Sequence, residues 1–184
     1  MRSDALNNRI AIIETASSLL RATGSIPLLD EVAEHAGISR TTFFRHFPDR
    51  GSMLEAMLER SIDKLEAAVT GMEQSDTALF DLLALLCEGA STELAFVNYC
   101  WDSSQRDEKA GAFLNRALAR ACSILESPIR RAVQAGLCRP DLTPRDIVLA
   151  APMLSGALRG RTAEEREILV ARVISLLTEG IRKR

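Results

Sequence analysis

Long apolar runs are missing from this sequence. No segment approaches the ~20 consecutive apolar residues that a membrane-spanning helix needs. The first ten residues, MRSDALNNRI, also lack the uninterrupted apolar stretch of a secretory signal peptide. These absences argue against a membrane protein or a secreted protein, and we expect the chain to act in the cytoplasm without a membrane partner.

Cysteines are few and scattered. They form no C-x-x-C pair, and no pair of histidines lies near them. In a reducing compartment, isolated cysteines on apolar helix faces usually serve as small core residues. We therefore expect no metal site, no cofactor and no disulfide framework. The cysteines are Cys87, Cys100, Cys122 and Cys138.

Catalytic motifs are absent as well. The two histidines, His35 and His46, both fall in one short segment near the N-terminus, and the sequence contains no G-x-S-x-G, phosphate-binding loop or H-E-x-x-H. Adjacent acids such as Glu164 and Glu165 fit the start of a helix, where carboxylates interact favourably with the helix dipole. The sequence thus predicts a protein that is not an enzyme.

Charge is nearly balanced, with a formal net charge of −2. Its distribution along the chain is more informative than its sum. Residues 1–50 contain six arginines and six acids, yet the stretch 36–48 contains Arg40, Arg45 and His46 and no acid. A local basic face on a near-neutral protein favours a short, specific DNA contact over general binding to polyanions.

Helical periodicity dominates what is present. Apolar residues recur at steps of three and four, and no segment shows the alternation or the β-branched density of a strand. The predicted fold class is therefore all-α. Gly24 should end a first helix, Pro27 should open a short second helix within its first turn, and Gly37 should close that helix. Ser39 and Asp49 are suited to cap a third and a fourth helix.

Longer helices are predicted beyond Gly71. Their ends are uncertain by ~2–4 residues. Pro128 lacks a backbone donor and clashes with the preceding turn, so we expect it to kink the helix that contains it. The predicted helices lie at about 76–90, 93–101, 107–136, 144–159 and 163–182.

The segment most informative about function is 28–47, LLDEVAEHAGISRTTFFRHF. Two short helices are predicted on either side of a tight turn at 36–38, and the small side chain of Ala33 lets them approach closely. In a helix-turn-helix, the first residues of the second helix enter the major groove of DNA and contact base edges. Phe43 and Phe47 should point into the core. The side chains predicted to face outward are Arg40, Thr41, Thr42, Arg45 and His46.

In this region the sequence resembles the TetR family of transcriptional regulators. The likeness is carried by R-I-x-x-I-x-x-A at 9–16, Gly24, V-A-x-x-A-G-I-S at 32–39, T-x-F-R-H-F-P-D-R at 42–50 and M-L-x-x-M-L at 53–58, and more weakly by AGLCRPDLTPRDIVL at 135–149. The resemblance implies a helix-turn-helix domain over 1–50 and a helical effector-binding and dimerisation domain over 51–184. It also implies a homodimer on double-stranded operator DNA, and repression relieved by a small molecule.

Matched residue by residue, the resemblance implies that Arg40, Thr41 and Thr42 contact bases. Arginine suits the O6 and N7 atoms of guanine, and threonine can hydrogen-bond to a base or place its methyl group against thymine. Ser39 and the backbone amides that follow it can hold a phosphate. The remaining candidate DNA-contacting residues are Phe44, Arg45, His46 and Arg50.

The sequence departs from the family pattern in three respects. Phe44 replaces the usual tyrosine, so a hydrogen bond to phosphate is lost and only packing remains. Arg50 replaces lysine, which keeps the positive charge. Pro27 and Leu28 stand where threonine or serine commonly caps the second helix, which puts a phosphate contact there in doubt.

A ligand pocket in such a fold would lie among the helices between about 76 and 136. The stretch FVNYCWD at 96–102 concentrates aromatic side chains with a few polar atoms, which is how small-molecule sites are usually built. Phe96 and Trp101 also fit a plain core role. Few charges interrupt 78–101, so an apolar or weakly polar effector is expected in preference to a polyanion. The candidate pocket residues are Phe96, Asn98, Tyr99, Cys100 and Trp101.

The last two predicted helices should form the dimer. Small residues at 150–157 permit close helix packing, and 163–182 carries an apolar arc too wide for one face of a small domain. Two-fold pairing of both helices would give a four-helix interface. The alternative is that these helices only complete the core of the monomer. The small residues are Ala150, Ala151, Ser155, Gly156 and Ala157.

Two other functions remain open. One is a redox-sensing regulator that uses one of the four cysteines, which requires an exposed thiol of low pKa. The other is an all-α carrier of a hydrophobic ligand that does not bind DNA, against which the arginine-bearing third helix argues. Salt-dependent binding to duplex DNA separates the carrier from a regulator. Loss of DNA binding on mild oxidation would identify the redox sensor.

Overall fold

A computed structural model describes residues 2–72, 75–158 and 162–183, and helices with their connecting loops make up these ranges. The all-α class predicted from periodicity is confirmed. None of the described helices is both long enough and apolar enough to cross a bilayer. The helices are α1 (Arg2–Thr23), α2 (Leu29–His35), α3 (Arg40–His46), α4 (Arg50–Gly71), α5 (Ala78–Arg106), α6 (Glu108–Gln134), α7 (Pro144–Val148), α8 (Ala150–Leu158) and α9 (Ala163–Ile181).

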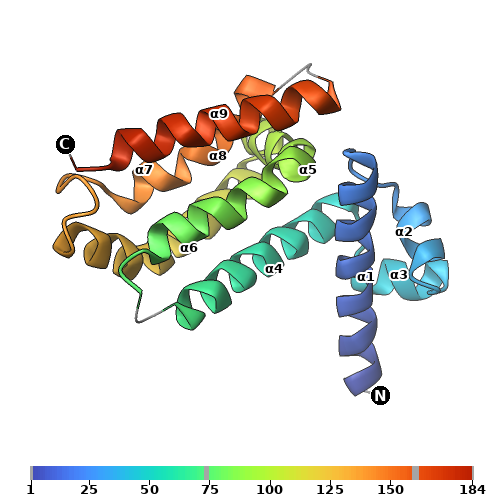
Figure 1. Cartoon of the computed structure of the whole chain (residues 1–184). Coiled ribbons are helices and arrows are strands. Elements are labelled where there is room, and N and C mark those ends of the chain that lie inside the picture. The colour runs from blue at the N-terminus through green and yellow to red at the C-terminus, as the bar shows by residue number, and fades with distance from the viewer. Residues whose placement is uncertain (1, 73–74, 159–161, 184) are drawn as a thin grey trace.

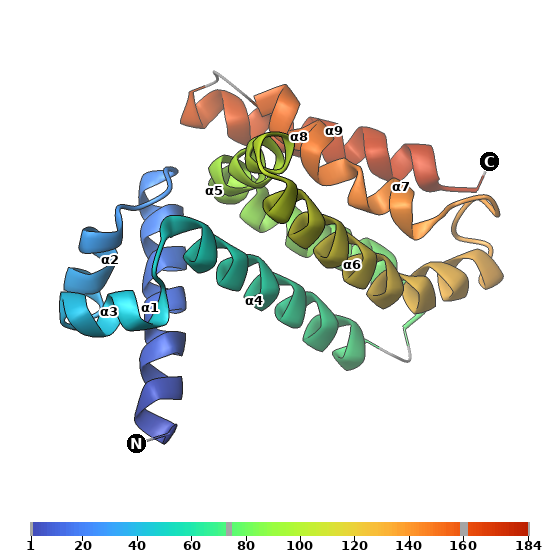
Figure 2. The same cartoon turned by 180° about the vertical axis from the view of Figure 1, so that it is seen from behind.

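The long helix α4 joins a three-helix unit to a larger helical bundle (Figures 1 and 2). Helices α1, α2 and α3 gather at one end of the molecule, and α4 begins beside them and runs into the bundle. There α5 and α6 pack together, α4 lies against α6, and α8 and α9 cover α5 on the opposite side. The expected domain boundary after residue 50 falls at the first residue of α4.

Local signals set several helix ends where the sequence predicts them. Gly24 follows α1 with a φ of 66°, and Gly37 lies in the turn after α2 with a φ of 65°. Glycine adopts this left-handed conformation without the steric penalty of a side chain. The side chains of Ser39 and Asp49 each accept a backbone amide of the helix that they begin, at 3.3 and 2.7 Å. Both predicted N-caps are therefore confirmed.

The start of α2 differs from the prediction. The helix begins at Leu29 with Leu28 as its N-cap, so Pro27 lies before the first turn and is buried. Leu28 offers no side-chain acceptor. Instead the Glu31 carboxylate accepts the Leu28 amide at 3.4 Å, which is the half of a capping box that does not depend on the N-cap side chain. The prediction that Pro27 opens this helix was wrong because Glu31 supports a start two residues later.

One apolar core fixes the orientation of α3. The rings of Phe43 and Phe47 are fully buried, with centroids 6.1 Å apart. They share a cluster with Ile12 of α1, Met53 of α4 and Phe96 of α5, the last of which is only 4% exposed. Full burial of one such side chain contributes about 1.5–3 kcal/mol. The bundle therefore contributes a residue, Phe96, to the core of the three-helix unit.

Helix α5 is continuous, whereas the sequence predicts two helices at 76–90 and 93–101. Gly, Ala, Ser and Thr at 89–92 include weak helix formers, but their preference is small beside the packing of α5 against α6, α8 and α9. The reverse happens at 144–159, which divides at Leu149 into α7 and α8. Helix α6 continues through Pro128, whose ring is buried.

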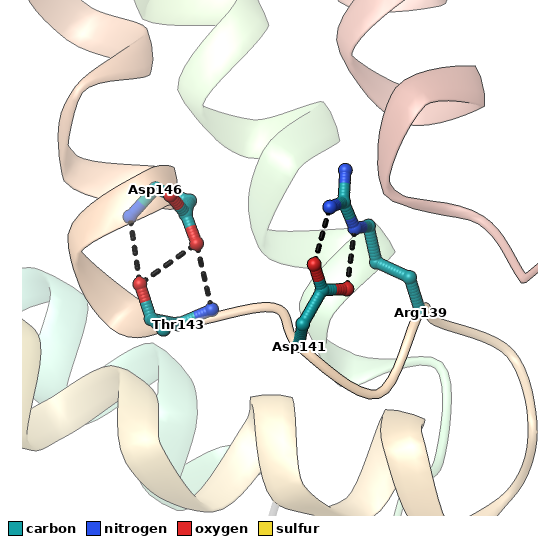
Figure 3. A network of polar contacts seen from close by, with 4 residues as sticks. All are labelled: Arg139, Asp141, Thr143 and Asp146. Carbon is teal, nitrogen blue, oxygen red and sulfur yellow. Dashed lines mark hydrogen bonds and ion pairs between the residues drawn. The ribbon is translucent and has the colours of Figure 1, made fainter.

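The loop between α6 and α7 has a defined polar geometry (Figure 3). Arg139 donates from Nε to Asp141 at 2.6 Å, and its guanidinium also pairs with the second carboxylate oxygen. The hydroxyl and the amide of Thr143 both donate to the Asp146 carboxylate, at 2.7 and 2.8 Å, and this begins α7. The Arg139 amide donates to the carbonyl of Ile181 at 2.9 Å. The loop therefore attaches the end of α9 to the corner between α6 and α7.

Candidate nucleic-acid interface and ligand cleft

The turn before α3 presents the start of this helix to solvent. Gly37 lets the chain reverse within a few residues after α2. The Ile38 amide then donates to the Ala33 carbonyl at 3.0 Å, which closes the turn. Ser39 caps α3, so that Arg40 is its first helical residue. Two short helices joined in this way, with the first turn of the second exposed, have the geometry of a helix-turn-helix.

The exposed side of α3 carries Arg40, Thr41, Phe44 and Arg45. Arg40 Nε lies 2.9 Å from the carboxylate of Asp30 on α2, and the Arg40 guanidinium lies 5.8 Å from the centre of the Phe44 ring. Both members of the ion pair are largely open to water, and exposed pairs of this kind contribute little to stability. Arg40 can therefore exchange Asp30 for a base edge at small cost.

Two residues that were expected to face outward are half-buried. The Thr42 hydroxyl accepts a hydrogen bond from the Ser39 hydroxyl at 2.9 Å, and so supports the cap of α3. The ring of His46 is half-buried, and its Nε2 atom has no hydrogen-bond partner within the described ranges. Burial, followed by the positive charges of Arg45 and Arg9, lowers the pKa of His46. Its neutral form is thus favoured near neutral pH when no phosphate is present.

Arg9 is a basic residue at this surface to which the sequence analysis assigned no role. Its guanidinium lies 4.6 Å from the centre of the Phe47 ring, and its charge acts on His46. Arg9 therefore joins Arg45 as a second positive charge near the end of α3. Arg9 is the first residue of the motif at 9–16, but its position beside the end of α3 follows only from the packing of α1 on the helix-turn-helix.

The side chain of Arg50 is half-buried and makes contacts within the chain. Its Nη2 atom donates to the carbonyl of Ile26 at 2.8 Å, and its guanidinium lies 5.7 Å from the centre of the Tyr99 ring. Its Nε atom is buried. These contacts with a carbonyl and an aromatic face would compete with the expected contact between Arg50 and the DNA backbone, which stays a prediction.

The aromatic stretch at 96–101 divides between two roles. Phe96 belongs to the core shared with the three-helix unit, which agrees with the core role that the sequence analysis gave as the alternative to a pocket role. Tyr99 and Cys100 line a cleft, while Trp101 is half-buried and lies outside the cleft lining. The side chain of Asn98 lies outside the described residues.

This cleft has a volume of about 400 Å³ and lies where α4 begins, α5 ends and α6 begins. Leu54 and Leu58 of α4 contribute to one wall, and Phe113 and Leu114 of α6 contribute to another. The α6 residues could not be identified from the sequence, because nothing local indicates that residues 109–114 pack beside residue 99.

Gly111 allows α5 and α6 to approach closely beside the cleft. A Cβ atom at this position would lie 3.1 Å from the carbonyl oxygen of Ser104 near the end of α5. That distance is tighter than about nine in ten real Cβ contacts, so a side chain at this position would require the neighbouring backbone to shift. The cleft therefore borders a tightly packed helix crossing.

Two of the described thiols, those of Cys100 and Cys138, are poorly suited to redox sensing. Burial raises the pKa of Cys100 to about 12. Burial also raises the pKa of Cys138, against a smaller opposing effect of Arg182. A thiol held in its protonated form is a weak nucleophile. Cys122 is half-buried, and the side chain of Cys87 lies outside the described residues. In the part of the chain that the structure describes, no group of His, Cys, Asp and Glu residues could hold a metal ion.

These features define the chain as a helix-turn-helix protein with a helical body. Residues 12–57 match the family described as bacterial regulatory proteins, tetR family. The HTH-type transcriptional regulator EthR of Mycobacterium tuberculosis is 32% identical over 71 residues. This match covers 38% of the chain and 32% of EthR, about a third of the length of that protein. Over residues 12–57 the chain is therefore similar to the tetR family of bacterial regulatory proteins.

Solved structures extend the likeness of fold to the whole chain. A TetR transcription regulatory protein from Mycobacterium vanbaalenii has a TM-score of 0.69 at 22% identity, covering 98% of both chains. A TetR transcriptional regulator from Streptomyces coelicolor has a TM-score of 0.68 at 20% identity, covering 95% of this chain and 98% of that one. A complex of SmeT with triclosan has a TM-score of 0.58 at 21% identity, covering 96% and 92%. At these identities the comparisons concern the fold alone.

Proposed function

We propose that this chain is a sequence-specific DNA-binding transcriptional regulator. The observation that carries the proposal is the first turn of α3, where Arg40 and Thr41 are exposed while Phe43 is fully buried. A rigidly held helix whose own first turn carries a basic residue and no acid suits the major groove. The tetR family match over 12–57 and the EthR relative, itself described as a transcriptional regulator, support the proposal.

The proposed contacts fall into two groups. Arg40 and Thr41 are the base-reading candidates, and Thr42 supports them through the cap of α3. Phe44, Arg45 and His46, together with the Ser39 cap, are candidates for the phosphate backbone. Phosphate contacts position a protein on DNA without reading its sequence, so substitutions in the two groups should have different signatures.

We propose a homodimer that pairs through α8 and α9. Ile168 and Leu176 of α9 are 68% and 58% exposed in the monomer, and Met153 of α8 is 57% exposed. Apolar side chains so exposed on two neighbouring helices favour burial against a second copy. Among the small residues expected there, Gly156 and Ala157 are exposed, Ala150 is buried, and the side chains of Ala151 and Ser155 lie outside the described residues. Such a dimer must place its two α3 helices about 34–36 Å apart to reach successive major grooves.

We propose repression as the default mode, relieved by a small molecule with an apolar body. Tyr99 and Cys100 line the cleft, and Tyr99 also contacts Arg50 at the start of α4. A ligand shifts the DNA affinity only if it binds one state more tightly than the other, and a site beside the helix-turn-helix offers that difference. A solved structure of similar fold, the complex of SmeT with triclosan, supports a ligand response.

The decisive experiment is DNA selection followed by a salt titration. The purified chain is incubated with random duplexes, and the retained sequences are tested by fluorescence anisotropy. We expect a near-palindromic site, and an affinity that falls linearly with the logarithm of salt concentration. Failure to retain any duplex at low salt would contradict a DNA-binding role and would favour the ligand carrier instead.

The redox-sensing alternative is disfavoured by the raised pKa values of Cys100 and Cys138. Treatment with dilute hydrogen peroxide should therefore leave DNA affinity unchanged. A large, thiol-reversible loss of affinity would instead point to Cys87 or Cys122.

A further inference from the structure

We infer that the cleft between α4, α5 and α6 binds an amphipathic organic anion, with an apolar aromatic body against Tyr99 and Phe113 and an acidic group at Arg106 and Lys109. This inference rests on the proposed ligand response and names the chemical class of the effector. It adds an acidic group to the apolar or weakly polar effector expected from the sequence. A volume of about 400 Å³ lies within the ~300–1,000 Å³ typical of small-molecule sites.

The apolar part of the lining comes from all three helices. Leu54 of α4 and Leu114 of α6 are buried, and Leu58 and Phe113 are half-buried beside them. Tyr99 of α5 adds a second aromatic ring. Aromatic side chains on two different helices suit a ligand with fused or linked rings, because ring faces and edges attract in offset arrangements.

The charged part of the lining favours an anion. Formally, three acids line the cleft against two bases. Asp49 and Asp107 are already engaged, however, because each accepts a helix-terminal backbone amide, at 2.7 and 2.9 Å. The helix dipole offsets part of each of these charges.

Arg106 and Lys109 have no ion-pair partner among the described residues, and both are exposed at the cleft. Glu55 is the single acid of the lining that caps no helix, and it lies between Leu54 and the α4 turn that carries Leu58. Apart from the two carboxylates that cap helices, the lining therefore carries two positive charges and one negative charge. A ligand with one acidic group and an apolar body satisfies this arrangement.

Two dyes of matched shape test the inference. The probe is 8-anilinonaphthalene-1-sulfonate, and its comparison is N-phenyl-1-naphthylamine, which has the same ring framework without the sulfonate. We expect the wild-type chain to bind the sulfonate about tenfold more tightly, as two exposed charge contacts allow. The Arg106→Ala/Lys109→Ala variant should lose this preference and keep its affinity for the neutral dye. Arg130→Ala, an exposed change farther along α6, should behave as wild type.

A third variant assigns the dyes to the cleft. Phe113→Ala should weaken the binding of both dyes several-fold, and thermal unfolding establishes that it remains folded. Should that variant unfold, Leu58→Gln provides a second change to the same lining. Equal affinities for the two dyes in the wild type would overturn the inference, as would a sulfonate preference that survives loss of both basic residues.

The dye measurements use no DNA, so they stand independently of the proposed function. A second titration, of the selected duplex with increasing sulfonate dye, addresses the regulatory role. We expect DNA affinity to fall in the wild type and to remain constant in the double alanine variant. Dye selectivity without any effect on DNA would support the anion site and contradict its role as the effector site.

Discussion

The guanidinium of Arg50 lies 5.7 Å from the centre of the Tyr99 ring, while the same group donates a 2.8 Å hydrogen bond to the carbonyl of Ile26. Ile26 immediately precedes the helix-turn-helix, Arg50 begins α4, and Tyr99 lines the cleft. One side chain thus connects the helix-turn-helix unit, the connecting helix and the candidate ligand site. A ligand that moves Tyr99 changes the support of the helix-turn-helix.

This connection predicts the behaviour of Arg50 variants. Arg50→Ala should lower both thermal stability and DNA affinity, and the Arg50–Tyr99 coupling in a double-mutant cycle with Tyr99→Ala should be about 0.5–1 kcal/mol. Tyr99→Phe keeps the ring and should be close to neutral. The salt dependence of DNA binding should not change in Arg50→Ala. A salt slope reduced by about one unit would instead identify Arg50 as a phosphate contact.

Base reading by Arg40 predicts a sequence-dependent loss. Arg40→Ala should weaken binding to the selected operator by about 1–3 kcal/mol and relax the preference at one base pair, with little change in binding to random duplex. Arg21→Ala removes an exposed arginine from the last turn of α1 and serves as the control. Wild-type operator affinity in the Arg40 variant, measured by anisotropy, would remove this residue from the reading surface.

Pairing through α9 predicts that an exposed leucine controls assembly. Leu176→Glu should convert the dimer into a folded monomer, because Leu176 is 58% exposed within the chain and a charge there disturbs only a partner. Operator affinity should fall in the same variant, since two half-sites are no longer bound together. Ala119→Glu, an exposed position on α6, is the control. Sedimentation that shows a dimer for Leu176→Glu would refute the α9 interface.

The Thr143–Asp146 cap predicts part of the acid sensitivity. Hydrogen bonds from the Thr143 hydroxyl and amide lower the pKa of Asp146 below its usual value. Its contribution to stability is therefore present above the unfolded-state pKa and is lost as the pH falls through the lowered folded-state pKa. Asp146→Asn should reduce the melting temperature near neutral pH and flatten its decline in acid. Asp76→Asn, which removes another exposed carboxylate, should leave the decline intact; parallel acid profiles for wild type and Asp146→Asn would disprove the assignment.

The features that the sequence predicted well depend on near neighbours. Ser39 and Asp49 cap helices through residues three positions ahead, and Phe43 and Phe47 are four apart on one helix face. Their positions follow from helix geometry alone. The all-α class follows from the same periodicity.

The features that escaped prediction depend on distant partners. Arg50 reaches a carbonyl 24 residues away, and its contact with Tyr99 depends on how α5 packs against α4. Phe113 becomes part of the cleft only because α6 returns beside the end of α5. The residues near a polar group in the sequence do not indicate which of several distant partners it contacts. For the same reason, the sequence identified α5 residues of the cleft but not those that α4 and α6 contribute.

The burial of Phe96 in the core of the three-helix unit has a consequence for modularity. A fragment that ends after α4 would keep Phe43 and Phe47 but would leave an unfilled space where the Phe96 ring now lies. Loss of the Phe96 ring should lower the free energy of unfolding by about as much as truncation of any other large core residue. A small domain is only marginally stable, so this loss is a large fraction of its stability. The three-helix unit is therefore not an independent domain. Fusing it to another protein requires an apolar side chain that takes the place of Phe96 in its core.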